Sequence, residues 1–423
     1  MKKLLKVTAM TGSLTLVKML MGFIIAKVVA IYTGPSGMAM LGQIQSVVTS
    51  LNGLVNAPTS NGIIKYTAEF SPKGTEACAP WWRAAVHWAL VISILAIAIT
   101  ISFSTMLSGW LFDNTEYAWL LILCACSLPL VTLGTLLTSI INGKQQYRQY
   151  IKVGMFSTLV TAGVMVYMVI RYGIQGALVA AALQNAIVGI AMLALNFRQP
   201  WFNFNNFWGR VERKYLSGLG NYILMAVTTA LTVPISFIFV RNEIIANTSW
   251  VDAGQWQAVW RISETYLSVL TIALGTYYLP KLATLTSRSE MQMEIINTLK
   301  VVIPFAILSA GAVFFFRDLV IKILFTDEFK GARDLFLVQL CGDVVKIISW
   351  VIAYPMLSNA KTKLYIFSEI FFSLTLVLFT QYFVRQLGVQ GANYAYLTNY
   401  SLYLIVMMFM FVFLKTFFVK TRI

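Results

Sequence analysis

The stretch GQWQAVWRISETYLS, from Gly254 to Ser268, lies in an apolar run over 251–278 that is long enough for a membrane-spanning helix of roughly 20 residues. Four polar residues in it recur at steps of four, three and four, the repeat of one helix face: Gln257, Arg261, Glu264 and Ser268. An ionised group at bilayer depth costs roughly 2.5 to 3.5 kcal/mol. We therefore expect this polar stripe to face a watery or protein-lined interior, where it is a candidate functional site.

The composition points to a membrane protein. Of 423 residues, 58% are hydrophobic and 11% are charged, against roughly 25% charged in ordinary soluble domains. Only helices and closed barrels satisfy their backbone hydrogen bonds in lipid, and apolar runs of about 20 residues indicate helices. The sequence predicts an all-α membrane protein with twelve transmembrane helices, at about 8–31, 38–66, 82–108, 117–141, 149–171, 175–197, 215–240, 251–278, 292–316, 331–357, 363–384 and 390–414.

The formal net charge of +16 reflects topology rather than nucleic-acid binding, because Lys and Arg of membrane proteins gather on the cytoplasmic side. The cations concentrate at alternate helix ends, on the side of residues 2–6, whereas the opposite ends carry few, Arg241 among them. Both termini are therefore predicted to be cytoplasmic. Four cations lie within the spans and do not act as topology signals: Lys18, Lys27, Arg261 and Lys346.

Two short motifs recur along the chain. GQIQ at 42–45 is echoed by GQWQ at 254–257, and GIQGA at 173–177 by GVQGA at 388–392, each at an offset of about 210 residues. The offset predicts a duplication of six helices, and an even number of spans makes the repeats parallel. We expect an N-lobe over 1–200 with helices 1–6 and a C-lobe over 201–423 with helices 7–12, around a central cavity.

The repeat gives the polar stripe an uncharged counterpart on the second predicted span. It consists of Gln45, Thr49, Asn52 and Asn56. At a rise of 1.5 Å per residue, Lys18 and Arg261 each lie roughly 15 Å deep, near the bilayer midplane. Glu264 is expected to be the partner that orients Arg261. The segment from Asn56 to Gly62 is expected to break its span.

Other charged residues leave alternatives open. Asp343 and Lys346, spaced i, i+3, either neutralise each other on one helix or take part in coupling or gating. Glu369 is either a proton-coupling carboxylate or a partner of the nearby Lys361 and Lys363. Lys27, near the outer end of its span, either snorkels to the interface or lines the cavity.

The sequence contains no arrangement typical of an enzyme. It has no set of nucleophile, base and orienting group, no phosphate-binding glycine loop with its lysine, and a single histidine, His87, beside cysteines that form no metal-ligand spacing. We expect no catalytic residue, no metal and no cofactor, so the protein is not expected to be an enzyme.

Several motifs together resemble a known transporter family. They are Trp256-Gln257, Ile262-Ser263, Tyr266-Leu267, LPKL at 279–282, RDLF at 333–336, Gln339-Leu340, Gly342-Asp343-Val344, Lys346, and the N-terminal Lys18 to Gly22, Lys27 and GPSG at 34–37. These residues resemble the Wzx-type O-antigen and lipid-linked oligosaccharide flippases. Those proteins form the polysaccharide transporter branch of the multidrug/oligosaccharidyl-lipid/polysaccharide exporter superfamily, which includes the enterobacterial lipid III flippases.

The resemblance implies a substrate and a cellular location. The substrate would be an O-antigen repeat unit linked to undecaprenyl diphosphate, moved from the cytoplasmic to the periplasmic leaflet of the bacterial inner membrane. Lys18 and Arg261 would bind the diphosphate, while Gln45, Asn52, Asn56 and Gln257 would bind sugars. Membrane lipid, an O-antigen polymerase and a chain-length regulator are the implied partners.

Two alternatives remain at this point. A cation-coupled multidrug antiporter of the same superfamily would need acidic cavity residues, and the N-lobe spans have no acidic residue at mid-depth. A membrane polysaccharide polymerase would need a large outer loop with catalytic side chains, whereas the longest outer loop, about 317–330, is short.

Overall fold

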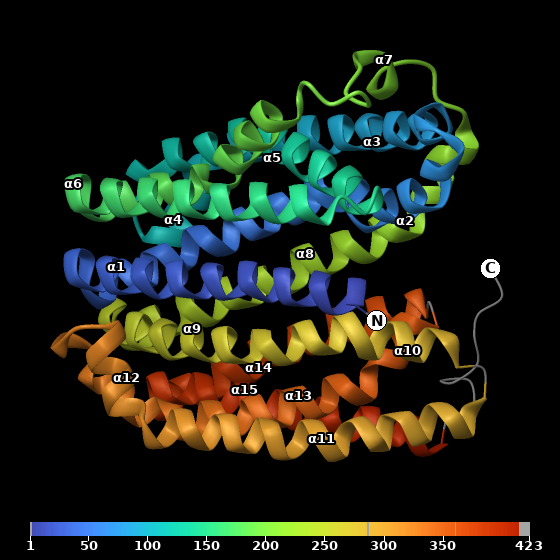
Figure 1. The fold of residues 1–423 in the computed structure, drawn as a ribbon. Coiled ribbons are helices and arrows are strands. Elements are labelled where there is room, and N and C mark those ends of the chain that lie inside the picture. The colour runs from blue at the N-terminus through green and yellow to red at the C-terminus, as the bar shows by residue number, and fades with distance from the viewer. Residues whose placement is uncertain (1, 286, 360, 414–423) are drawn as a thin grey trace. The chain divides into compact units, whose positions relative to one another are not determined.

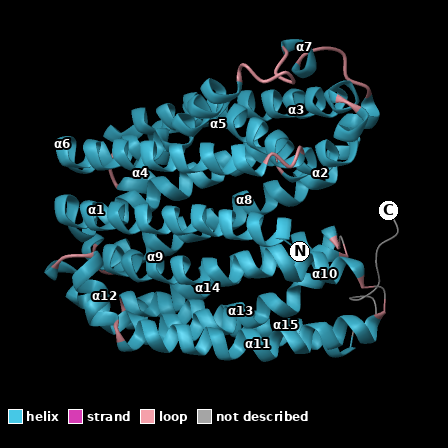
Figure 2. Cartoon of the chain, viewed as in Figure 1, coloured by secondary structure: helices cyan, strands magenta, loops and turns pink. Residues whose placement is uncertain are grey.

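The computed structural model describes residues 2–285, 287–359 and 361–413, and within these ranges it contains helices and no β-strand (Figures 1 and 2). The predicted all-α class is confirmed. The chain packs as two compact units: unit 1 comprises Met1–Thr33 and Met40–Ile235, and unit 2 comprises Gly34–Ala39 and Ser236–Ile423. The lobe boundary between residues 200 and 201 stays a prediction drawn from the sequence repeat.

The elements of the first half of the chain follow one another through short connections. They are α1 Lys2–Asn56, η1 Ala57–Thr59, α2 Asn61–Phe70, η2 Ser71–Lys73, α3 Thr75–Ser102, α4 Ser104–Phe112, η3 Thr115–Tyr117, α5 Ala118–Gly143, α6 Tyr147–Asn196 and α7 Phe204–Phe207. The predicted break after Asn56 is confirmed, because α1 ends there, a separate turn that contains Pro58 begins at Ala57, and α2 starts at Asn61. Proline lacks the N–H that would continue the helix.

The second half repeats this order. After α8 Arg213–Asn247, which runs from unit 1 into unit 2, come α9 Trp250–Ala273, a π-helical turn η4 Leu274–Tyr278, α10 Leu279–Thr284, α11 Arg288–Phe315, α12 Arg317–Leu324, η5 Asp327–Leu335, α13 Phe336–Ser358, α14 Thr362–Leu387 and α15 Val389–Phe413. Both α3 and α11 have 28 residues, and each is followed by a short helix, α4 or α12.

The repeated GIQGA and GVQGA motifs form the same backbone break. Gly173 interrupts α6 with φ 58° and ψ −133°, and Gly388 separates α14 from α15 with φ 59° and ψ −145°. A backbone of this kind is almost restricted to glycine because a Cβ would clash. The agreement in conformation supports the duplication inferred from the sequence.

The chain is a multi-pass membrane protein. In the described part of the chain, nine helical stretches are long and apolar enough to cross a membrane. Two of them, Gly12–Lys73 and Tyr147–Asn196, have 62 and 50 residues, far more than the roughly 20 of one crossing, and contain the breaks at Gly34 and Gly173. The count of twelve spans stays a prediction.

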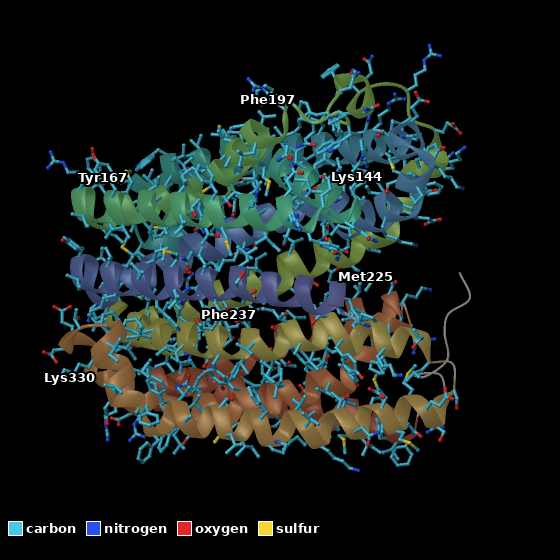
Figure 3. All side chains as sticks on the ribbon, viewed as in Figure 1. Lys144, Tyr167, Phe197, Met225, Phe237 and Lys330 are labelled. Atoms are coloured by element: carbon cyan, nitrogen blue, oxygen red, sulfur yellow. The ribbon has the colours of Figure 1, made fainter. Side chains whose placement is uncertain are left out.

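Each unit has its own core. In unit 1, buried Trp82 donates a hydrogen bond from Nε1 to Thr67 Oγ1 at 2.9 Å, so its polar atom is satisfied. The ammonium of Lys144, labelled in Figure 3, lies 5.7 Å from the ring of Trp82. In unit 2, Tyr278, Ile347 and Met407 belong to one buried cluster, which joins the π-helical turn, α13 and α15.

Helices α5 and α6 meet at a pair of glycines. A Cβ added to Gly189 would lie 2.0 Å from Leu130 O, and one added to Gly134 would lie 2.7 Å from Gly189 Cα. Backbone atoms cannot retreat cheaply, so a side chain at either position would force the helices apart. Gly163, on the same helix α6, has nothing within 4 Å of its Cβ position.

Gly189→Ala is therefore expected to destabilise the protein by about 1–3 kcal/mol, the cost of overpacking. Thermal unfolding of the purified protein in detergent, followed by fluorescence, measures the effect. Gly163→Ala is the matched control and should leave the melting temperature unchanged or slightly raised, because alanine favours helix. Equal melting temperatures for the two variants would contradict the close packing at Gly189.

Candidate functional site

The polar stripe lies on α9, whose start is determined by a side-chain cap. Ser249 Oγ accepts a hydrogen bond from Asp252 N at 3.1 Å and donates one to Asp252 Oδ2 at 2.8 Å. Such a cap satisfies an N–H that has no partner within the helix. The helix then continues without a break through Ser268, so the predicted shared face is confirmed as helical geometry.

The stripe is anchored by a residue that the sequence analysis misplaced. Arg241 of α8 is only 2% exposed, and its Nη1 donates a hydrogen bond to Gln257 Oε1 at 2.8 Å. It does not lie at the end of its helix, where the sequence analysis placed it, because α8 continues for six residues beyond it to Asn247. The signal that could have found it is the apolar pair Ile244-Ile245 after Arg241, which extends the helix.

Arg261 and Glu264 do not form the direct pair that their spacing predicted. Arg261 is partly buried and Glu264 is exposed, and among the described residues no carboxylate lies within 4.0 Å of the Arg261 guanidinium. Glu264 is instead close enough to act electrostatically on Arg241, Arg261 and Lys346. Glu264 thus acts on cations from three helices, α8, α9 and α13, and Lys346 is in addition acted on by Asp343.

Asp343 lies at the polar centre of unit 2. It is fully buried on α13, and its carboxylate accepts hydrogen bonds from Tyr266 Oη at 2.8 Å, Tyr396 Oη at 2.9 Å and Gln339 Nε2 at 3.2 Å. The tyrosines belong to α9 and α15, so the carboxylate joins three helices. Buried charges of this kind are tolerated where several donors satisfy them.

Lys346, one turn further along α13, is surrounded by aromatic rings. Its Nζ lies 5.1 Å from the ring centroid of Trp260, 4.9 Å from Trp350, 5.5 Å from Tyr396 and 5.3 Å from Tyr400. We call these four rings the aromatic cage. Asp343 and Lys346, which either neutralise each other or take part in coupling, act on each other electrostatically, but in the described chain no carboxylate oxygen lies within 4.0 Å of Nζ. Three of the four rings come from α9 and α15, and Trp350 lies on α13 itself.

Phe237 completes this aromatic layer within unit 2. Its ring, labelled in Figure 3, lies 4.3 Å from that of Trp260, which in turn stacks on Trp256 at 5.8 Å and meets Tyr396 edge-on at 5.2 Å. Such pairs contribute about 0.5–1.5 kcal/mol each beyond their burial. The cage is therefore held rigidly from α8, α9 and α15.

In unit 1, the uncharged counterpart of the stripe follows α1. Gln45, Asn52 and Asn56 are partly buried on one face of this helix, and Thr49 Oγ1 donates to Gln45 O at 2.7 Å. Lys18 is exposed and Lys27 partly buried on the preceding part of α1. The structure thus places the uncharged residues together, as the repeat predicted, while their binding roles stay predictions.

Glu369 of α14 is partly buried and acts electrostatically on Tyr400 and Tyr403 of α15. Within the residues that the structure describes, it forms no ion pair with Lys361 or Lys363. The alternative of a neutralised surface carboxylate is therefore not what the structure contains. Over the same residues, no group of three or more His, Cys, Asp and Glu could hold a metal ion.

Comparison with known families shows which family the chain belongs to. A family model described as "Polysaccharide biosynthesis protein" matches residues 4–286, more than half of the sequence. The chain belongs to this polysaccharide biosynthesis protein family. A curated relative, the lipid III flippase of Escherichia coli strain K12, is 29% identical over 404 residues, which cover 95% of this chain and 96% of the relative; the Shigella flexneri lipid III flippase matches equally.

Solved structures share the fold of this polysaccharide biosynthesis protein. An inward-facing MATE family multidrug transporter of the MOP superfamily superposes with a TM-score of 0.74 at 12% identity, covering 94% of this chain and 97% of the other. The lipid II flippase MurJ, in an inward closed conformation, superposes with a TM-score of 0.72 at 14% identity, covering 96% and 87%. At such identities the likeness establishes the membrane transporter fold alone.

Removal of the Asp343 carboxylate tests the polar centre of unit 2. Asp343→Leu is expected to destabilise the protein by about 3–5 kcal/mol, since it leaves three donors, two of them buried, and nearby cations without their acceptor. Asp343→Asn keeps one acceptor oxygen and should cost less. Thermal unfolding in detergent ranks the variants, with Asp334→Asn, an exposed carboxylate on η5, as the control. An unchanged melting temperature for Asp343→Leu would contradict this role.

Proposed function

We propose that this protein translocates oligosaccharide units linked to undecaprenyl diphosphate, O-antigen or a related glycan, across the bacterial inner membrane. The units would move from the cytoplasmic to the periplasmic leaflet by alternating access of two lobes. The proposal is supported by family membership and by the name of the lipid III flippase relative, which aligns over nearly the full length of both chains.

One observation carries the proposal at the level of chemistry. The guanidinium of Arg261 lies within a helix of a membrane protein and has no carboxylate of the described residues within 4.0 Å, although an arginine in such a place normally has a close partner. Lys18 is likewise without an ion pair in the described chain. A diphosphate supplies the anionic, multidentate acceptor that such cations bind best.

The roles follow from the side-chain chemistry. Lys18 and Arg261 are proposed to bind the diphosphate, and the amides of Gln45, Asn52 and Asn56 to bind sugar hydroxyls. Gln257 contributes its NH₂ group to the same task, because its oxygen accepts from Arg241. Glu264, exposed beside the cations, competes with the anion and so favours its release.

Coupling and gating are assigned to the charged residues outside this set. Asp343, Lys346 and Glu369 of unit 2 and Lys27 of unit 1 are the proposed candidates. In the same proposal both termini are cytoplasmic, no cofactor takes part and no covalent bond of the substrate changes. An O-antigen polymerase and a chain-length regulator would use the translocated units.

The positions of the carboxylates distinguish the proposed function from a drug antiporter. A cation-coupled drug antiporter would need acidic residues inside both lobes, whereas those of residues 1–235 lie at helix ends or in connections: Glu69, Glu76, Asp113, Glu116 and Glu212. A polymerase would join sugars rather than move them. Purified protein in vesicles, supplied with lipid-linked sugar, separates translocation from glycosyl transfer.

The charge of Arg261 provides the direct test. Arg261→Glu is expected to reduce O-antigen display at least about tenfold when expressed in a strain that lacks its own flippase, because a carboxylate repels the diphosphate. Arg210→Glu, on the exposed connection before α8, is the matched control and should restore display fully. Membrane insertion of both is checked by immunoblot; full restoration by Arg261→Glu would refute the assignment.

A further inference from the structure

The ammonium of Lys346 is buried without an acceptor. The residue is 8% exposed, and in the described chain no side-chain or backbone oxygen accepts a hydrogen bond from Nζ. An ammonium carries three donors, and aromatic faces attract its charge without replacing three oxygen acceptors. A buried charged donor without an acceptor destabilises the protein. The presence of such an ammonium therefore points to a ligand that supplies the acceptor.

Asp343 does not fill this role, although it lies one turn away. Its two carboxylate oxygens already accept from two tyrosine hydroxyls and the Gln339 amide. These neutral donors stabilise the carboxylate locally and leave the ammonium at a distance. The buried region therefore contains a carboxylate satisfied by hydrogen bonds beside an ammonium that it attracts but from which, in the described chain, no oxygen accepts a hydrogen bond.

The surrounding charges favour an incoming anion. Three cations, Arg241, Arg261 and Lys346, have two carboxylates near them: Asp343 acts on Lys346, and Glu264 acts on all three. Of the cations, Arg241 already donates to Gln257. An oxyanion that approached the exposed Glu264 would meet Arg261 first, and the flexible four-carbon stem of Lys346 would let its ammonium follow.

The cage also connects this ammonium to the packing of three helices. Trp260 belongs to α9, Trp350 to α13, and Tyr396 and Tyr400 to α15. The hydroxyl of Tyr396 at the same time donates to Asp343. Withdrawal of Nζ from the cage removes the cation from all four rings at once, so it loosens the contact between α9, α13 and α15.

We propose that Lys346 is an oxyanion-binding residue that lies in the aromatic cage until substrate arrives, and that its departure from the cage loosens the junction of α9, α13 and α15. The ligand is an oxyanion of the lipid-linked saccharide, either a phosphate oxygen of the diphosphate or a sugar carboxylate. This inference rests on the proposed function and adds a binding residue together with the conformational consequence of binding.

Tryptophan fluorescence of the full-length protein in detergent tests the binding step. Inorganic pyrophosphate and glucuronate are titrated separately, with glucose as the neutral match for glucuronate. We expect one or both anions to change the emission. A response to pyrophosphate identifies the oxyanion as a phosphate oxygen, and a response to glucuronate identifies it as a sugar carboxylate. Trp350→Phe should reduce the amplitude, because Trp350 reports on the cage.

Lys346→Met, which keeps an apolar stem in the cage, is expected to weaken the apparent Kd for that anion at least about tenfold. Lys346→Arg should weaken it less, and Lys363→Met, an exposed lysine of α14, not at all. Thermal unfolding of each variant establishes that it is folded. An unchanged Kd in folded Lys346→Met, or no response of the wild-type protein to either anion, would overturn the proposal.

The binding assay and the display assay fail independently. If the wild-type protein restores O-antigen but Lys346→Met binds anions normally, the translocation proposal stands and the role of Lys346 is refuted. If the wild-type protein binds anions through Lys346 but transports no lipid-linked sugar, the residue assignment stands and the proposed function is refuted.

Discussion

An ionised side chain inside a membrane-spanning helix must find a partner, and unit 2 is organised around that constraint. The carboxylate of Asp343 meets it with donors from α9, α13 and α15. Those bonds fix the register of the three helices against one another, and the aromatic layer around Trp260 packs on the same junction. The remaining charges then lie where the helices leave room for them.

The two repeats have the same backbone plan and different chemistry. Gly173 and Gly388 give both halves the same break, and the stripes on α1 and α9 occupy equivalent helices. Unit 1 presents amides along its stripe, whereas unit 2 presents Arg261 and Glu264. The duplicated scaffold thus carries an uncharged stripe on α1 and a charged one on α9.

Features that depend on neighbours in the chain were predicted well from the sequence. The helical face shared by Gln257 and Arg261, the break after Asn56 and the repeat at Gly173 and Gly388 all arise from local periodicity or from the special conformations of proline and glycine. Pairings were predicted poorly. The i, i+3 spacing favoured Arg261–Glu264 and Asp343–Lys346 as direct pairs, and Arg241 was placed among the topology signals.

The sequence by itself determined the class of the protein, because the length and number of its apolar runs leave helices in a bilayer as the solution for the backbone. It also determined that charges lie within those helices. Only the tertiary structure decided which groups surround each charge. The donors to Asp343, the rings around Lys346 and the arginine behind Gln257 come largely from other helices, at separations that spacing along one helix does not encode.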